Sequence, residues 1–189
     1  MIKIIKKNLI FKNKYFKVFN DDVIFNNNHK GTHLKIEGSE AQEGISVLPI
    51  LENGNFLLIK NFRYSVGQYL YQSIKGGNGC NFNNNENIAL ICVKEELEEE
   101  INKKSENFLY LGQSFEAPSI ISSKLYNFLA FDCIEVINKK RFKEKTECIE
   151  EIVEVDIKKI DEFMKDKVFC NSTLFLIEKY KNYIKQNLK

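Results

Sequence analysis

NIALICVKEELEEEI, residues 87–101, has the clearest structural pattern in the chain. It contains no glycine or proline, and its apolar residues recur at the spacing of one helix face, at Leu90, Val93, Leu97 and Ile101. Because successive helical residues are rotated by about 100°, Glu96, Glu99 and Glu100 project from a single arc bordering this stripe. The pattern therefore predicts an amphipathic helix with three carboxylates that face one place.

The three carboxylates have two interpretations. Like charges three and four positions apart oppose a helix, and a bound divalent cation would reverse that effect. Magnesium is the natural candidate, because it prefers oxygen ligands and shares its shell with waters and substrate phosphates. The alternative is a solvated acidic face, which is the usual role of such runs and suits Glu95 and Glu98 well.

A glycine- and asparagine-rich loop, residues 76–85, precedes this helix. A backbone turn in front of a metal-binding helix can bring carbonyl oxygens and amide groups to the same cation or phosphate. A simple turn is the other interpretation of Gly76 and Gly77. The loop and the acidic helix together favour a metal site more than either feature does alone.

The rest of the chain alternates between short strand patterns and two late helices. Residues 15–37 predict a small antiparallel unit, and residues 45–51 and 56–62 predict a hairpin of two central strands that turns at Asn53-Gly54. Further strands are expected at 108–115, 125–133 and 152–156, and helices at 157–165 and 173–185. This order predicts an α/β or α+β fold in which a mixed sheet has helices packed on its faces.

Composition argues against several classes of function. The chain has 189 residues, 43% of them hydrophobic, and a formal net charge of +2, so we expect a real core and no nucleic-acid or membrane partner. The five cysteines are scattered without a paired metal-binding spacing, which favours a reduced cytoplasm. Residues 1–11 lack a continuous apolar stretch and a cleavage site, so we predict no signal peptide and no membrane span. The expected ligand is a small molecule.

The acidic helix and the segment before it resemble the Nudix hydrolase family. Residues 96–100, Glu-Leu-Glu-Glu-Glu, match the E-U-x-E-E core of the Nudix box, in which U is aliphatic. Residues 62–77 are similar to the segment that runs from an aromatic-arginine pair to E-x-P-x-G-G in the ADP-ribose pyrophosphatase-like branch. The resemblance implies the Nudix fold, in which a mixed β-sheet lies between helices. It also implies that residues 1–42 are an N-terminal β unit that builds a homodimer, and that residues 43–189 are the hydrolase domain.

The resemblance implies a metal site with named ligands. Glu96, Glu99 and Glu100 would bind Mg²⁺, and the main-chain carbonyl of Lys75 would help them. Mn²⁺ is expected to substitute for Mg²⁺.

Substrate and catalytic residues follow from the same resemblance. Arg63 would contact the substrate. The other residues on matching substrate-binding segments are Gln72, Gly76, Gly77 and Pro118. The region in which these enzymes often place a catalytic carboxylate contains Glu147, Glu150 and Glu151. We take Glu150 as the candidate, although this region has no unique alignment.

The sequence also departs from the family pattern. The box arginine is replaced by Glu95 and the terminal box glycine by Asn102. The early box glutamate falls at Asn87, unless Glu86 substitutes for it after a register shift, and the loop from Gly76 is several residues longer. Outside the box, three further replacements are Gln72 for a glutamate, Ile74 for a proline and Ser119 for a glycine. An acidic residue in place of the arginine removes an ion pair that orients the catalytic glutamate.

Two functions therefore compete. The first is magnesium-dependent hydrolysis of the pyrophosphate bond of a nucleoside diphosphate linked to a sugar, with ADP-ribose, cleaved to AMP and ribose 5-phosphate, as the best single substrate. The alternative is a catalytically silent Nudix module that binds a nucleotide or a protein partner. Retained ligand binding without cleavage in excess metal would indicate the second.

Overall fold

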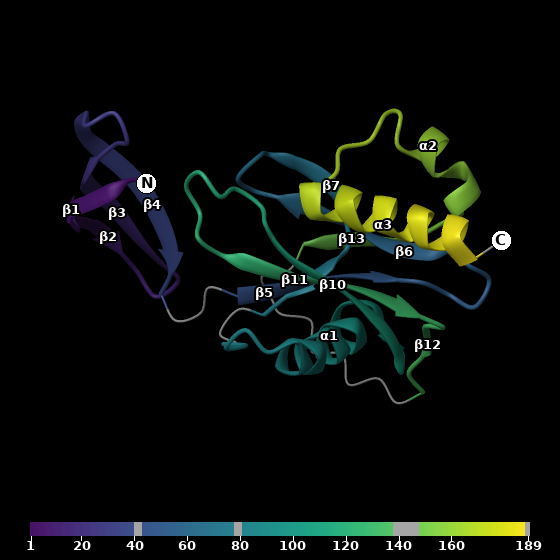
Figure 1. Ribbon diagram of the computed structural model, residues 1–189. Coiled ribbons are helices and arrows are strands. Elements are labelled where there is room, and N and C mark those ends of the chain that lie inside the picture. Colours follow the sequence, from purple (N-terminus) through teal and green to yellow (C-terminus); the bar gives the residue numbers. More distant parts are fainter. Residues whose placement is uncertain (40–42, 78–80, 138–147, 188–189) are drawn as a thin grey trace.

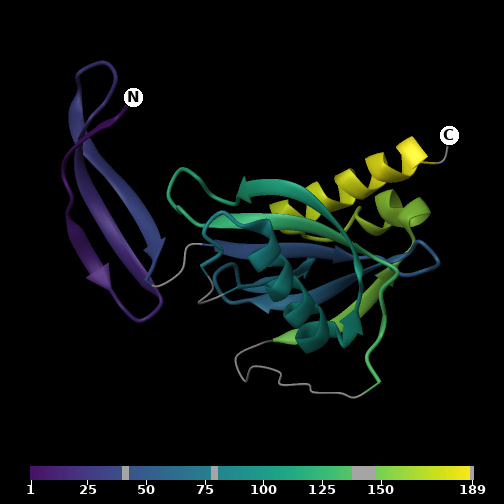
Figure 2. The ribbon, with the colours of Figure 1, turned by 60° about the horizontal axis from the view of Figure 1, so that its bottom comes forward.

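The N-terminal part of the chain forms a sheet of its own. The computed structural model describes residues 1–39, 43–77, 81–137 and 148–187. The first sheet contains β1 (Lys3–Lys6), β2 (Leu9–Lys12), β3 (Phe16–Ile24) and β4 (Lys30–Gly38). Strand β3 pairs with β4 along its whole length, and its other edge is shared by β1 and β2. The predicted antiparallel unit is confirmed, and β1 and β2 extend it beyond what the sequence indicated. Figure 2 shows this sheet set to one side of the body.

Two further sheets form the body (Figure 1). The first has the order β10-β11-β5-β8, formed by Asn107–Phe115, Lys124–Phe131, Glu43–Pro49 and Ile74–Gly76. Strands β11 and β5 are parallel, and the other neighbours are antiparallel, so the sheet is mixed. The second has the order β13-β6-β7, formed by Ile149–Val155, Phe56–Arg63 and Gln68–Gln72. A short pair, β9 (Lys103–Lys104) with β12 (Ile134–Glu135), follows the end of α1.

The hairpin predicted for β5 and β6 is wrong. The turn is present, and Gly54 adopts a φ of +80° there. However, the two strands belong to different sheets, and an isolated bridge from Ile50 to Phe56 joins them at the turn. Each strand is apolar on both faces and has a neighbouring strand on both edges. Both strands are therefore interior strands, as predicted, but each lies inside a different sheet.

The predicted helices are largely confirmed. Helix α1 spans Glu86–Ile101 and helix α3 spans Asn171–Asn187. The helix expected over residues 157–165 is instead a short 3-10 turn, η1 (Ile157–Lys159), followed by the single turn α2 (Ile160–Phe163). Among the described helices, none is both long and apolar enough to cross a membrane.

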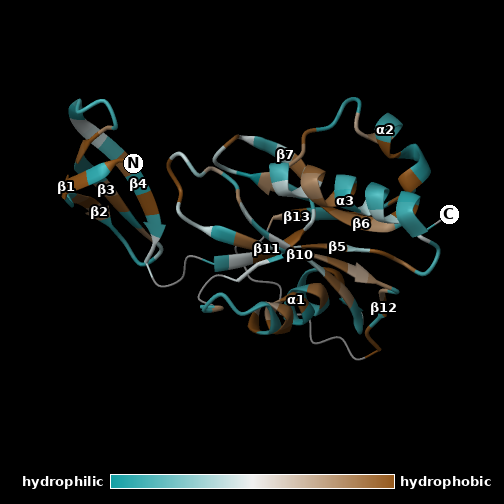
Figure 3. Ribbon diagram, viewed as in Figure 1, coloured by the Kyte–Doolittle hydropathy of each residue, from teal (hydrophilic) through white to brown (hydrophobic). Residues whose placement is uncertain are grey.

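Helices α1 and α3 cover opposite faces of the body, and alternate strand residues point to each. In β5, Ile45 and Val47 belong to the core beneath α1, whereas Leu48 belongs to the core beneath α3. Figure 3 shows hydrophobic residues along the strands between the two helices. A side chain on one face of a strand therefore lies near α1, and its sequence neighbour lies near α3.

Candidate functional site

The ends of helix α1 are capped by asparagines. The Asn85 side chain accepts a hydrogen bond from the Asn87 N–H at 2.9 Å, a common way to satisfy a free amide at a helix start. At the other end Asn102 has a φ of 56°, and its N–H bonds to the Glu98 carbonyl. A helix often ends on a left-handed residue, usually glycine and sometimes asparagine. Asn102 therefore replaces the expected box glycine with the same backbone shape.

Glu96 rests against the glycine pair that precedes the helix. Its Oε1 accepts a hydrogen bond from the Gly77 N–H at 3.2 Å. A Cβ added to Gly76 would lie 1.6 Å from the same oxygen, so any other residue there would displace the carboxylate. Gly77 has a φ of +105°, and a Cβ there would lie 3.0 Å from the Gly44 Cα. Gly77 is therefore required both by its backbone conformation and by a close approach, whereas a side chain at Gly76 would move the Glu96 carboxylate.

The other two carboxylates of the predicted metal set differ in environment. Glu100 is only 4% exposed, whereas Glu99 is exposed. Among the residues that the structure describes, no three His, Cys, Asp or Glu side chains are grouped so as to hold a metal ion. The structure thus brings Glu96 to the glycine pair without gathering all three carboxylates at one point.

The donor chemistry nevertheless fits magnesium. All the predicted ligands are oxygen atoms, which is the preference of Mg²⁺. The Glu96 carboxylate occupies the space that a side chain at Gly76 would fill, directly beside the Lys75 peptide unit. The site therefore has a backbone cradle on one side and the acidic face of α1 on the other.

The acidic replacement in the box lies away from this cradle. Glu95 is exposed, so water screens its charge. Lys94 does not take over the role of the missing arginine, because its Nζ pairs with Glu106 Oε2 at 2.7 Å.

Arg63 and Gln72, both predicted to contact the substrate, lie together on strands β6 and β7. Arg63 Nε donates to Gln72 Oε1 at 2.9 Å. Gln72 is 1% exposed, so its amide supports the guanidinium from inside. A glutamine in place of the family glutamate keeps the acceptor for Arg63 but lacks the negative charge.

The Lys75 side chain makes an ion pair with Glu116, which follows β10. Ser172 Oγ, in the first turn of α3, donates to Glu116 Oε1 at 2.8 Å. Burial alone would raise the pKa of the Glu116 carboxyl, but Lys75, the Ser172 hydroxyl and the nearby Arg63 charge together lower it. No local pattern in the sequence indicates this pair, because 41 positions separate its members.

The candidate catalytic residue Glu150 makes an ion pair with Lys60, at 2.6 Å between Oε2 and Nζ. Side chains along β6 point alternately to the α1 core and to the α3 core. Lys60 is two residues from Leu58, which lies in the α3 core, so the Lys60 side chain points to the α3 side. The structure therefore does not bring Glu150 to the carboxylates of α1. Glu151 is exposed, and Glu147 lies outside the described residues.

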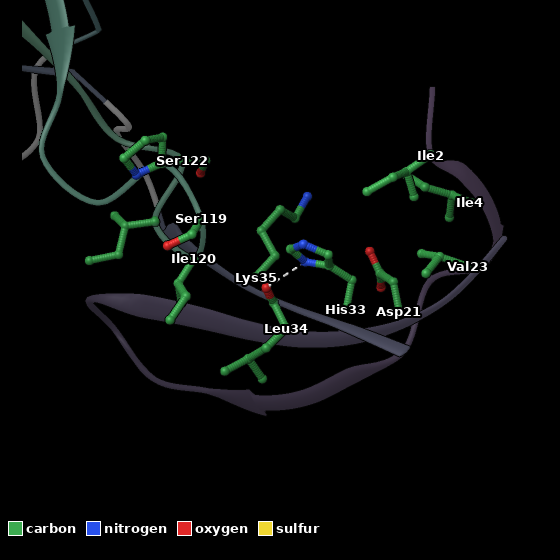
Figure 4. Close-up of a pocket in the computed structure, with 12 residues that line it drawn as sticks. Ile2, Ile4, Asp21, Val23, His33, Leu34, Lys35, Ser119, Ile120 and Ser122 are labelled. Atoms are coloured by element: carbon green, nitrogen blue, oxygen red, sulfur yellow. Dashed lines mark hydrogen bonds between the residues drawn. The ribbon is translucent and has the colours of Figure 1, made fainter. Parts of the chain in front are cut away.

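Pro118 lies in the wall of a cavity of about 260 Å³ between the N-terminal sheet and the loop after β10. Figure 4 shows Asp21, His33 and Lys35 on the side of the sheet and Ser119, Ile120 and Ser122 on the side of the loop. The loop is attached to the sheet by backbone hydrogen bonds between Ile36 and two of its residues, Ile120 and Ser122. Pro118 thus lies where the N-terminal sheet meets the loop after β10, and it does not line the Glu96 cradle.

Glu43 is a half-buried carboxylate that the sequence did not single out. It accepts hydrogen bonds from the Phe82 N–H at 2.7 Å and the Tyr126 hydroxyl at 3.3 Å, and it pairs with Lys124 at 2.9 Å. Burial alone would raise the pKa of the Glu43 carboxyl, but these partners outweigh it and lower the pKa. Glu43 therefore anchors the end of the long loop that leads into α1.

We expect Glu43→Gln to lower the free energy of unfolding at neutral pH. A carboxyl whose pKa is lower in the folded state adds stability above its unfolded pKa, and that stability disappears as the pH falls through the folded pKa. The difference between the variant and the parent should therefore shrink in acid. Urea denaturation at a series of pH values measures it, with Glu52→Gln as the exposed control. A difference that is constant with pH would contradict the assignment.

The comparisons with known proteins agree with this fold. No protein-family model and no curated protein matches the chain. A solved structure described as an ADP compounds hydrolase is similar to it, with a TM-score of 0.77 and 16% sequence identity, over 98% of this chain and 95% of that one. This likeness shows the fold. The chain has the Nudix fold, in which a mixed sheet and an antiparallel sheet lie between helices, with a small N-terminal antiparallel unit beside them.

Proposed function

We propose that the protein is a magnesium-dependent hydrolase that cleaves the pyrophosphate bond of a nucleoside diphosphate linked to a sugar. The observation that carries the proposal is the Glu96 carboxylate, which accepts a hydrogen bond from the Gly77 N–H and occupies the space that a side chain at position 76 would fill. The similar solved structure is described as a hydrolase of ADP compounds, which supports the same substrate class. ADP-ribose, cleaved to AMP and ribose 5-phosphate, is the substrate we propose first.

In this proposal the carboxylates of Glu96, Glu99 and Glu100 and the Lys75 carbonyl hold Mg²⁺, or Mn²⁺ in its place. The bound ion supplies charge neutralisation at the phosphate and lowers the pKa of a bound water. Because Glu99 is exposed, its side chain is free to turn toward the ion by changing rotamer.

The remaining proposed roles belong to the protein's own groups. Arg63, oriented by its hydrogen bond to Gln72, binds a substrate phosphate through its other guanidinium N–H groups. Gly76 and Gly77 keep the approach to the metal-binding carboxylates open. Glu150 would act as general base only if Lys60 released it, so a role for Glu150 requires that ion pair to break.

The test is a cleavage assay with purified protein in Mg²⁺ or Mn²⁺ against ADP-ribose, NADH, diadenosine polyphosphates and sugar nucleotides. We expect ADP-ribose to be cleaved fastest and AMP to be released. Failure to cleave any of these compounds, at any metal concentration, would reject the hydrolase.

One set of observations favours the second candidate, a silent module. Glu95 stands in place of the box arginine, and Gln72 lacks the charge of the family glutamate. On this alternative, isothermal titration calorimetry would detect nucleotide binding to a protein that cleaves nothing. A protein that neither binds nor cleaves a nucleotide would instead favour a protein partner. We do not propose a nucleic-acid partner. Affinity for a random oligonucleotide that falls steeply as the salt concentration rises would indicate one.

We also propose that the N-terminal unit, residues 1–42, forms a homodimer in the reduced cytoplasm. Phe11 and Phe16 lie on the same face of its sheet and are 54% and 50% exposed. Soluble monomers seldom leave large contiguous apolar patches uncovered. Of the cysteines that the structure describes, Cys133 and Cys170 form no disulfide, which agrees with a reduced compartment. Cell fractionation tests the compartment, and recovery in a membrane or secreted fraction would reject it.

Light scattering after size exclusion should therefore give twice the chain mass of 22.1 kDa. Phe16→Lys should shift the protein toward the monomer, because it places a charge on the apolar face beside Phe11. The control is Phe115→Lys, which changes an exposed aromatic residue outside this sheet. A parent protein that is monomeric at all accessible concentrations would overturn the proposal.

A further inference from the structure

Glu116 connects three elements that lie far apart in the sequence. It lies immediately after β10, and its carboxylate pairs with Lys75 in β8 and accepts a hydrogen bond from Ser172 in α3. The Lys75 side chain is only 14% exposed, so this ion pair is shielded more than a typical surface pair. Glu116 itself is 45% exposed.

The loop that carries Glu116 is held in place at its far end. The Ile120 carbonyl accepts from the Ile36 N–H at 2.8 Å, and the Ser122 N–H donates to the Ile36 carbonyl at 3.1 Å. Within the loop, the N–H groups of Ile120 and Ile121 both bond to the Ala117 carbonyl. Glu116 is therefore presented from a loop that is anchored to the N-terminal sheet.

Strand β8 needs such an anchor. It has three residues and lies at the edge of its sheet, so β5 is its only partner in the ladder of described strands. Ser73, just before it, is fixed by a buried network in which its N–H donates to Thr173 Oγ1 at 2.9 Å and its hydroxyl bonds to Ser46 at 2.8 Å. Glu116 supplies the next attachment along the strand, at Lys75.

The two faces of β8 serve different partners. Ile74 packs in the core beneath α1, so by alternation the Lys75 side chain points to the face of α3, and Gly76 returns to the face of α1. On that second face, Gly76 and Gly77 contact Glu96. Holding Lys75 from one side therefore sets the position of the glycine pair on the other.

We propose that Glu116 is a positioning residue of the proposed hydrolase site, acting through Lys75 on the glycine pair against which Glu96 rests. The inference deepens the proposed function and rests on it. Residues that orient the ligands of a metal typically change metal affinity by about ten- to a hundredfold when they are removed. An ion pair that only stabilises the fold would leave the metal affinity of the folded protein unchanged.

The experiment compares the full-length parent with Glu116→Gln and with the charge-swapped double variant Lys75→Glu/Glu116→Lys. The control is Asp161→Asn, which removes the ion pair between Asp161 and Lys181 on α2 and α3. The dissociation constant for Mn²⁺ is measured by electron paramagnetic resonance, alongside kcat and KM for the cleaved nucleotide. Melting temperatures show that every variant is folded at the temperature of measurement.

We expect Glu116→Gln to weaken Mn²⁺ binding about tenfold and to lower kcat more than it changes KM, consistent with the loss of a supporting partner. The charge swap should recover most of the Mn²⁺ affinity, and Asp161→Asn should match the parent. Equal Mn²⁺ affinity in Glu116→Gln and the parent would overturn the proposal, and so would a swap no better than the single variant.

The Mn²⁺ measurement separates this inference from the function on which it rests. A parent that binds Mn²⁺ but cleaves no nucleotide would reject the hydrolase, while the affinities of the variants would still decide the role of Glu116. A parent that binds no Mn²⁺ would overturn the inference, because there would be no metal site to position.

Discussion

Glu96→Gln is expected to lower kcat/KM for the cleaved nucleotide by about a hundredfold or more, in the range seen when one preorganised electrostatic group is lost. Glutamine has nearly the same shape and keeps an oxygen that can accept from the Gly77 N–H, so the cradle should survive. What disappears is the negative charge that the proposed Mg²⁺ requires. Initial rates at saturating and limiting substrate, in excess Mg²⁺, measure the effect.

The matched control is Glu98→Gln, which removes the same charge from an exposed position of the same helix. It should keep nearly full activity, because its side chain leaves α1 in a different direction from that of Glu96. Equal losses in the two variants would mean that the total acidity of α1, rather than the position of Glu96, is what matters. No loss in Glu96→Gln would remove Glu96 from the proposed metal site.

Gly76→Ala should produce the second large effect, through geometry instead of charge. The added Cβ would lie 1.6 Å from Glu96 Oε1 and 1.9 Å from its carboxyl carbon, so the carboxylate must move. A displacement of about 1 Å at a catalytic group can cost on the order of a hundredfold in rate. We therefore expect a rate loss of that order together with weaker Mn²⁺ binding.

Two further variants identify the cause of that loss. Gly67→Ala is the control for backbone effects, because Gly67 has a φ of +67° and no atom within 4 Å of an added Cβ. It should lower the melting temperature without changing Mn²⁺ affinity. Combining Gly76→Ala with Glu96→Ala should restore most of any stability that Gly76→Ala loses, because the clashing carboxylate is gone. A crystal structure of Gly76→Ala with Glu96 unmoved would contradict the clash.

Local patterns in the sequence were sufficient to identify α1 and its acidic face. The 3.6-residue period of Leu90, Val93 and Leu97 is a property of one segment, and the helix is formed and buried as that period predicts. A segment rich in glycine and asparagine likewise predicts a turn from its composition alone. Gly76 and Gly77 can therefore be placed in a turn without knowledge of their spatial neighbours. Glu96, one of the three predicted metal ligands, is the residue of α1 that bonds to this glycine pair.

The tertiary structure alone decided how distant segments meet. The sequence paired β5 with β6 because they are adjacent in the chain, but the structure gives each of them partners in separate sheets. The ion pairs of Glu43 with Lys124 and of Glu116 with Lys75 join positions with no shared local pattern. A hydrophobic period reports which face of a segment is buried, whereas the partner of a buried charge depends on the path of the whole chain. Local sequence patterns therefore specify the helix, its carboxylates and the glycine pair, whereas packing between distant segments places Glu96 against the glycines and Glu150 against Lys60.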